Sequence, residues 1–193
     1  AILGFSELLK MELPGKLNDK QKRYVGEIHA GGNHLLKLIN ELLQLTKLEA
    51  GKFDLLIESF DSQIWVEDCL AALVNLALAK KMVLNIDKKS DKGNICADKV
   101  RLTHVLYNLV SNAIKFSKPQ TNVYVLIQRH LDGWLISVTD QGIGISKNNQ
   151  GAIFEKFTQL ENPLDKNAEG TGLGLPLARS LVEAHGGKLW LQN

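Results

Sequence analysis

Apolar side chains recur with a heptad spacing between residues 18 and 50, and no proline interrupts this segment. The apolar positions of the two heptad registers are Ile28, Leu35, Leu42, Leu38 and Leu45. This periodicity predicts one long helix with a continuous apolar seam. Leu36, Ile39 and Leu43 widen the seam into a broad stripe, so we expect the helix to pack on more than one neighbour.

The opening segment of the chain predicts a second, shorter helix. Ile2, Phe5 and Leu9 follow a similar spacing, and Pro14-Gly15 marks a turn before the long helix. Because one hairpin cannot cover so broad a stripe, we expect two copies to pair through residues 1–50 into a dimeric four-helix bundle. The alternative is a monomeric hairpin that docks on the rest of the chain.

After the long helix the pattern changes to short strands that alternate with helices. Strands are expected at residues 53–57, 82–87, 94–97, 122–129, 134–140 and 188–191. Helices are expected at residues 61–81, 98–116, 151–157 and 173–185, with a polar loop at 158–169. Asp61 and Asp98 can cap the first two helices, and Asp132-Gly133 predicts a hairpin between antiparallel strands. We therefore expect a helical hairpin domain over residues 1–52, followed over residues 53–193 by an α/β two-layer sandwich. Its sheet should be mixed and largely antiparallel, with helices on one face.

Charge and apolar content narrow the possible classes of protein. The 193 residues include 23 basic and 21 acidic side chains spread along the chain, so no charged block suits a nucleic acid. The longest apolar stretch, from Cys69 to Ala79, is shorter than the roughly 20 residues that span a bilayer. Cys69 and Cys96 have neither zinc-ligand nor disulfide spacing. We expect a cytoplasmic setting, with any membrane attachment carried by segments outside this chain.

Four short blocks in the second half of the chain carry the candidate chemistry. The first lies on the predicted helix 98–116, where Asn108 and Asn112 share a face and Lys115 follows one turn later. An amide oxygen is a suitable ligand for Mg²⁺, and a lysine can reach a phosphate. The alternative is that the two asparagines form a polar bond inside the protein.

The second block is Asp140-Gln-Gly142-Ile-Gly144, which follows a predicted strand. A carboxylate at this place can accept a hydrogen bond from the exocyclic amine of adenine. The two glycines let the backbone make room for a flat ring. A plain turn after a strand is the alternative.

The third and fourth blocks are Phe154-Glu-Lys-Phe157 and Gly170-Thr-Gly-Leu-Gly174. The glycine block opens a predicted helix, whose free N–H groups attract phosphate. Its spacing differs from those of the dinucleotide fingerprint and the P-loop. The polar residues 158–169 suit a lid over a nucleotide, although a plain surface loop has the same composition.

The four blocks match in order the N, G1, F and G2 boxes of sensor histidine kinases. In addition, Ala1–Leu9 and Leu48–Gly51 resemble the end of the first and of the second helix in the dimerisation domain of that family. The resemblance implies the ATP-binding sandwich that gyrase, the heat-shock chaperone and mismatch-repair ATPases share. It also implies ATP and Mg²⁺ as ligands.

Individual roles follow from the resemblance. Asn112, assisted by Asn108, would ligate Mg²⁺, Lys115 would assist at the phosphates, and Asp140 would bind the adenine amine. The implied pocket residues are Asn108, Asn112, Lys115, Phe116, Asp140, Gly142, Ile143, Gly144, Gly170, Thr171, Gly172, Leu173 and Gly174. Phe154 and Phe157 would pack and support the lid.

The chain departs from the family pattern at three places. The phospho-acceptor histidine of the family, which an acidic residue follows, would lie before Ala1. The histidines present are His29, His34, His104, His130 and His185, and none is followed by that pattern. At the other end, the family usually adds a strand beyond the equivalent of residues 189–192, so the domain is expected to lack its last strand. Gln141 and His104 replace residue types that are common in the family, without abolishing binding.

The resemblance implies a kinase that moves the γ-phosphoryl group of ATP to a histidine and then to an aspartate of a response regulator. Without the acceptor, this chain is expected not to phosphorylate itself. The alternative is an ATP-hydrolysing switch, whose relatives carry a glutamate one turn before the metal-binding asparagine; this chain has Asn108 there. A non-enzymatic dimerisation module is disfavoured, because every box holds competent residue types.

Overall fold

The computed structural model describes residues 1–51, 53–131, 133–159 and 170–192. The chain divides into two compact units, which we call the helical unit (Ala1–Thr46) and the α/β unit (Lys47–Asn193).

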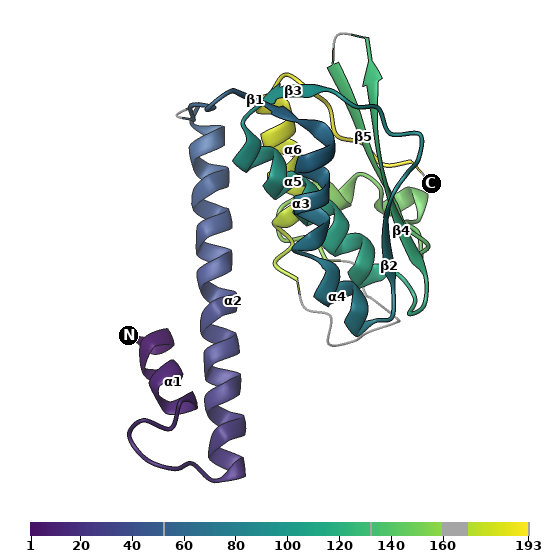
Figure 1. Cartoon of the computed structure of the whole chain (residues 1–193). Coiled ribbons are helices and arrows are strands. Elements are labelled where there is room, and N and C mark those ends of the chain that lie inside the picture. Colours follow the sequence, from purple (N-terminus) through teal and green to yellow (C-terminus); the bar gives the residue numbers. More distant parts are fainter. Residues whose placement is uncertain (52, 132, 160–169, 193) are drawn as a thin grey trace. The chain divides into compact units, whose positions relative to one another are not determined.

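The helical unit contains α1 (Ile2–Lys10) and most of α2 (Asp19–Glu49), which confirms the two predicted helices (Figure 1). α2 begins with a reciprocal cap, in which the side chains of Asn18 and Gln21 each accept a hydrogen bond from the other's backbone N–H at 2.9 Å. The two helices pack closely at Gly32, where a Cβ atom would lie 2.8 Å from Leu3 Cδ2. Gly32 therefore lets the two helices approach closely, and the Asn18–Gln21 cap marks the start of α2.

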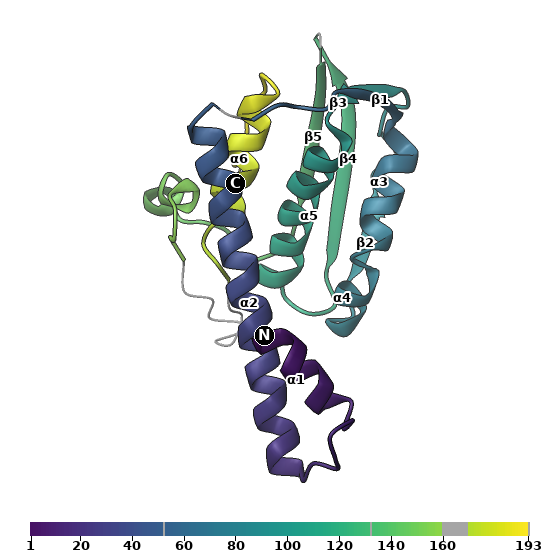
Figure 2. The ribbon, with the colours of Figure 1, turned by 90° about the vertical axis from the view of Figure 1, so that its left-hand side faces the viewer.

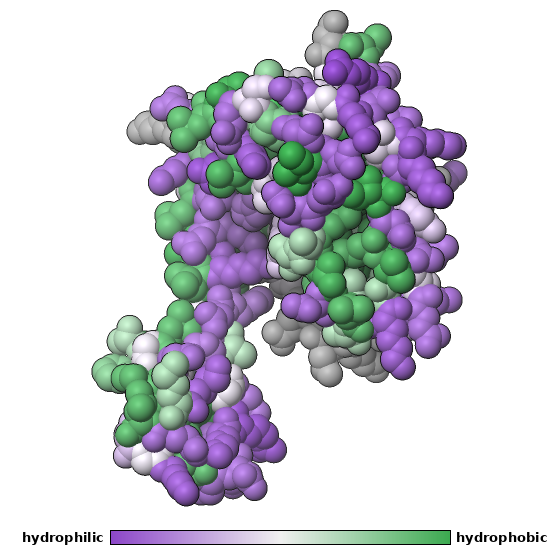
Figure 3. Space-filling model, in the orientation of Figure 1, coloured by the Kyte–Doolittle hydropathy of each residue, from purple (hydrophilic) through white to green (hydrophobic). Residues whose placement is uncertain are grey.

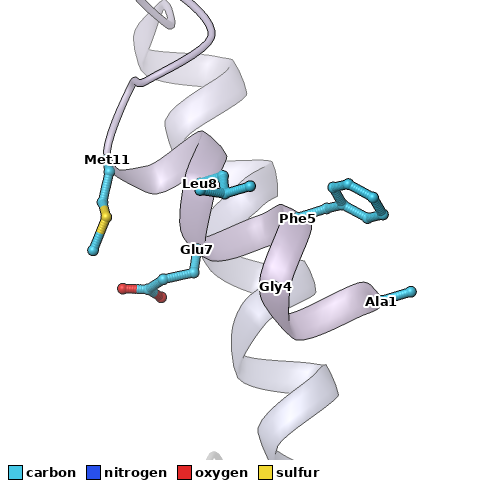
Figure 4. Close-up of a pocket in the computed structure, with 6 residues that line it drawn as sticks. All are labelled: Ala1, Gly4, Phe5, Glu7, Leu8 and Met11. Atoms are coloured by element: carbon cyan, nitrogen blue, oxygen red, sulfur yellow. The ribbon is translucent and has the colours of Figure 1, made fainter.

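The apolar stripe of the helical unit remains largely exposed. Leu35 and Leu42 of the heptad seam expose 52% and 40% of their surface. Residues of α1 and its two flanking positions line a shallow pocket: Ala1, Gly4, Phe5, Glu7, Leu8 and Met11 (Figure 4). The space-filling view shows apolar side chains on the surface of this unit (Figure 3). Exposed apolar area of this extent is typical of a surface that binds another protein.

The α/β unit contains two sheets and a layer of helices. Its strands are β1 (Glu58–Asp61), β2 (Val83–Ile86), β3 (Asn94–Ala97), β4 (Asn122–His130) and β5 (Gly133–Thr139). Its α-helices are α3 (Ser62–Ala71), α4 (Val74–Ala79), α5 (Lys99–Phe116) and α6 (Gly174–Ala184). Two short 3₁₀ turns, η1 (Lys147–Asn149) and η2 (Ala152–Phe154), precede α6.

The strand pairing confirms a mixed sheet. β1 pairs antiparallel with β3, and β4 pairs parallel with β2 and antiparallel with β5. Figures 1 and 2 show α3, α5 and α6 on one side of the β2–β4–β5 sheet. The predicted α/β architecture with helices on one face is therefore confirmed.

The core lies between this sheet and α3 and α5. Val123, Val125 and Ile127 alternate along β4 and are at most 1% exposed, as expected for the buried face of a strand. They belong to one cluster with Trp65 of α3 and Val110 of α5. The packing fixes the orientation of α5, which carries the first of the four blocks.

The first predicted strand is wrong. Residues 53–57 are not in a strand, and β1 begins at Glu58 instead. The register explains the difference, because Phe60 lies opposite Ile95 of β3 and both side chains are buried, whereas Leu56 is 80% exposed. The buried partner, and not the apolar character of residues 53–57, determines where the strand forms.

Three other predicted elements also differ from the structure. The helix predicted at 61–81 is divided into α3 and α4 by a turn at which Leu73 is buried. The helix predicted at 151–157 is reduced to η2, and residues 188–191 pair with no described strand. Asp132 of the hairpin and residues 160–169 of the predicted lid lie outside the described residues.

Within the described parts of the chain, we find no helix that combines the length and the apolar character needed to cross a membrane.

Candidate functional site

Asn108 and Asn112 share a face of α5, and Asn108 contacts the glycine block Gly170–Gly174. Asn108 is buried, and its Nδ2 atom lies 3.5 Å from the carbonyl oxygen of Gly174. A Cβ atom on Gly174 would lie 3.3 Å from Asn108 Oδ1, so the start of α6 approaches α5 closely. Among the described residues, the side chain of Asn112 has no hydrogen-bond partner. Its amide is therefore free to bind a ligand.

Lys115 continues the same face toward the glycine block. A Cβ atom on Gly170 would lie 2.9 Å from Lys115 Nζ, and this Nζ atom lies 5.1 Å from the ring centroid of Phe116. The structure thus places a cation beside the first glycine of the loop. This arrangement suits a phosphate that the backbone and the lysine approach together.

The Asp140–Gly144 block meets the carboxyl end of α5, next to Lys115. Asp140 Oδ1 accepts a hydrogen bond from Gly142 N at 2.8 Å, and Gly142 forms an isolated antiparallel bridge with Ser117. A Cβ atom on Gly142 would lie 2.7 Å from the carbonyl oxygen of Phe116, so only glycine fits here. Asp140 is exposed, as an acceptor for a ligand must be.

The hydroxyl of Ser117 supports a bound group at this place. Ser117 is fully buried, and its Oγ atom has no hydrogen-bond partner in the described structure. A buried hydroxyl without a partner costs about 1–3 kcal/mol. Because Ser117 pairs with Gly142 beside Asp140, a polar ligand or an ordered water at this site would remove the cost.

The Phe154–Phe157 block is joined to the glycine block. Phe157 N donates to the carbonyl oxygen of Gly172 at 3.0 Å, and Gly172 has a φ of +68°. A Cβ atom on Gly172 would lie 2.7 Å from the carbonyl carbon of Phe157. The guanidinium carbon of Arg179 lies over the ring of Phe154, 5.3 Å from the centroid of that ring. The two blocks therefore form one connected loop structure.

The other predicted pocket residues differ in their exposure to a ligand. Leu173 is fully buried, and its N–H donates to the hydroxyl of Thr171 at 3.1 Å, so both side chains serve the packing of the loop. Ile143 is 43% exposed, and Gly144 has a φ of +66° with open space around it.

Sequence reasoning missed two polar residues at the site. Lys80 Nζ donates to the carbonyl oxygens of Ile114 and Lys115 at 3.1 and 2.7 Å, where it stabilises the carboxyl end of α5. Gln159 Nε2 donates to the carbonyl oxygen of Gly170 at 2.8 Å. Lys80 is 34 and 35 positions from the residues whose carbonyl oxygens it contacts, and Gln159 is 11 positions from Gly170. No local pattern in the sequence indicates either contact.

The donor set fits magnesium bound together with a phosphorylated ligand. In the described residues there is no group of three or more His, Cys, Asp or Glu side chains that could hold a metal alone. The amide of Asn112 and the approach of Lys115 to Gly170 instead provide a neutral oxygen and a positive charge. Mg²⁺ typically takes one or two protein oxygens and completes its shell with phosphates and water.

Comparison with known families gives two matches that together cover most of the chain. Residues 1–51 match the His Kinase A (phospho-acceptor) domain. Residues 97–193 match the family described as histidine kinase-, DNA gyrase B-, and HSP90-like ATPase.

Individual proteins give the same result. The circadian input-output histidine kinase CikA of Synechococcus elongatus is 37% identical over 194 residues, which cover all of this chain and 26% of CikA. The structure of full-length ShkA in complex with AMPPNP aligns with a TM-score of 0.79 and 29% identity, over 96% of this chain and 38% of ShkA.

The histidine kinase ThkA, solved in complex with the response regulator protein TrrA, aligns with a TM-score of 0.70 over all of this chain and 53% of ThkA. Its identity of 20% shows a shared fold only. The chain spans about a quarter of the length of CikA.

Proposed function

This chain belongs to the histidine kinase family, and from that premise we propose that its α/β unit binds Mg-ATP and donates the γ-phosphoryl group to a histidine. The observation that carries the proposal is the position of the carboxyl end of α5 between two glycine blocks. Lys115 of α5 approaches Gly170, and the carbonyl oxygen of Phe116 approaches Gly142. One helix thus connects a phosphate-binding loop to a strand end that suits adenine.

We assign roles to the residues as follows. Asn112, with Asn108 behind it, would hold Mg²⁺, and Lys115 with the N–H groups of the 170–174 loop would hold the phosphates. Asp140 would accept from the adenine amine, beside Gly142 and Phe116. Bound Mg²⁺ would neutralise the negative charge of the phosphates. The protein side chains position the nucleotide and exclude water.

Transfer is favoured over hydrolysis by the residue at position 108. Asn108 is buried and its amide faces Gly174, so the position one turn before Asn112 offers no carboxylate to activate water. We therefore propose that the γ-phosphoryl group passes to an acceptor histidine outside the five of this chain, and from there to an aspartate of a response regulator. The complex of ThkA with TrrA supports the second step by analogy.

Incubation of the chain with ATP labelled at the γ-phosphate tests this assignment. We expect neither acid-labile label on the protein nor release of phosphate above the uncatalysed rate. Acid-labile label on His29 or His34 would contradict the assignment of the acceptor. Rapid release of phosphate that is lost when Asn112 is replaced would contradict the proposal that this site transfers the phosphoryl group without hydrolysing ATP. It would favour the hydrolysing switch.

We also propose that the helical unit forms a homodimer through residues 1–50. The exposed heptad side chains support this proposal, because water-exposed leucines at this spacing gain from pairing. Leu35→Lys should shift the chain from dimer to monomer in analytical ultracentrifugation. Leu131→Lys, which changes a 92% exposed leucine of the α/β unit, is the matched control and should remain dimeric. A wild-type chain that is monomeric at micromolar concentration would contradict the proposal.

A further inference from the structure

Residues 53–57, which we call the linker, join α2 to β1 and lie outside regular secondary structure. Leu56 N donates to Asp98 Oδ2 at 3.0 Å, and the guanidinium of Arg101 lies 4.8 Å from the ring centroid of Phe53. Phe53 and Leu55 of the linker are half-buried, whereas Leu56 and Ile57 expose 80% and 58% of their surface. The exposed second half of the linker is therefore held by the contact of Leu56 with Asp98, at the amino-terminal end of α5.

Asp98 also connects α5 to the end of α6. Its backbone N–H donates to His185 Nε2 at 3.1 Å, so this nitrogen must be unprotonated. The proton of the neutral ring then lies on Nδ1, which is 2.8 Å from the carbonyl oxygen of Leu181. His185 thus joins the last turn of α6 to the residue that holds the linker.

An ordinary helix cap does not need this arrangement, as Asp61 of the same unit shows. Asp61 caps α3 with one oxygen, Oδ1, which accepts from Gln63 N and Ile64 N. Asp98 instead divides its two oxygens between Arg101 N of its own helix, at 3.0 Å, and Leu56 N of the linker. The second oxygen is directed to a segment 42 residues earlier in the chain.

The ionisation of Asp98 agrees with these contacts. Burial alone would raise the pKa of the Asp98 carboxyl, but hydrogen bonds from the N–H groups of Arg101 and Leu56 lower this pKa below its ordinary value. The charge of Arg101 acts in the same direction. A group with a lowered pKa stabilises the fold above its ordinary pKa, and this contribution is lost as the pH falls through the lowered value. The contacts therefore persist at neutral pH.

We propose that Asp98 is a positioning residue that clamps the linker to the start of α5 and, through His185, to α6. The clamp shortens the free connection between α2 and β1. Releasing the five linker residues would add roughly 17 Å of possible reach, at about 3.3 Å for each extended residue. Because α6 begins at the Gly170–Gly174 loop, the clamp ties the linker to the same helix that starts at the proposed phosphate site.

Amide hydrogen exchange measured by NMR on the full chain tests the clamp without nucleotide, so its outcome is independent of the proposed function. Asp98→Ser keeps an oxygen that can cap α5 and removes the second acceptor. We expect exchange of the Leu56 amide to become about tenfold faster, while the amides of the first turn of α5 stay close to wild type. Asp61→Ser is the matched control, and its effect should be confined to the first turn of α3.

His185→Ala tests the second half of the clamp. It should speed exchange of the Asp98 amide and, less strongly, that of the Leu56 amide, whereas His130→Ala should leave both unchanged. Unchanged exchange of the Leu56 amide in Asp98→Ser, or an equal increase in Asp61→Ser, would overturn the proposal. An effect of His185→Ala on the Asp98 amide alone would overturn the connection to α6.

Discussion

Replacing Asn112 with alanine is expected to lower the affinity for Mg-ATP by about 10- to 100-fold. Loss of one metal-ligating or charge-assisted contact costs about 1.5–3 kcal/mol, and each 1.4 kcal/mol changes a dissociation constant tenfold. The folded state should not suffer, because the Asn112 side chain has no partner among the described residues and alanine is the better helix former. Isothermal titration calorimetry, with thermal unfolding in parallel, measures both quantities.

Two variants make this result specific. Asn33→Ala removes an exposed asparagine from α2 and should leave the affinity unchanged. Asn108→Ala should lower both affinity and stability, because Asn108 is buried and contacts Gly174. Wild-type affinity in Asn112→Ala would remove Asn112 from the proposed metal site.

Gly172→Ala is expected to disrupt the loop at the start of α6. An alanine with a φ of +68° costs about 1–2 kcal/mol, and its Cβ atom would lie 2.7 Å from backbone carbon of Phe157. Because the neighbour is backbone, the loop must move, and the Phe157 N to Gly172 O hydrogen bond is lost. We expect a thermal midpoint several degrees lower, at about 2–4 °C for each kcal/mol, and weak nucleotide binding.

Gly144→Ala is the matched control for Gly172→Ala. Its φ of +66° imposes the same backbone strain, but no atom lies within 4 Å of the added Cβ. The difference between the thermal midpoints of the two variants therefore isolates the clash with Phe157. Equal effects would show that strain alone, and not the contact between the two blocks, explains the loss.

Local signals in the sequence were sufficient for much of the fold. The Asp61 and Asp98 caps, the strand at 94–97 and the helix ending at Phe116 all appear where residue types and spacing predict them. The antiparallel pairing of β4 with β5 follows the predicted hairpin at residue 133. These features depend on contacts within a few residues, which a single sequence records directly.

Long-range pairing explains the errors. Residues 53–57 have strand-like composition, but Phe60 finds the buried position opposite Ile95, and the linker is held by Asp98 instead. No local pattern indicates which apolar residue will find a buried partner. For the same reason the turn at Leu73, which divides the predicted long helix, could not be foreseen.

In the candidate site, too, local features could be predicted from the sequence and long-range contacts could not. Residue types predicted the blocks, but the contacts that join them depend on the fold. The approach of Lys115 to Gly170, the bond from Lys80 to the end of α5 and the orphaned hydroxyl of Ser117 each connect segments far apart in the chain or depend on burial. The sequence thus predicted the components, and packing determined their arrangement.

Titration of the wild-type chain with AMPPNP, with and without Mg²⁺, tests the central claim most directly. The proposed site predicts one nucleotide bound per chain in the presence of Mg²⁺, with weaker binding when the metal is chelated. It also predicts that Asp140→Ala loses binding while the dimer persists. Absence of nucleotide binding by a folded wild-type chain with Mg²⁺ present would contradict the claim that the four blocks form an ATP site.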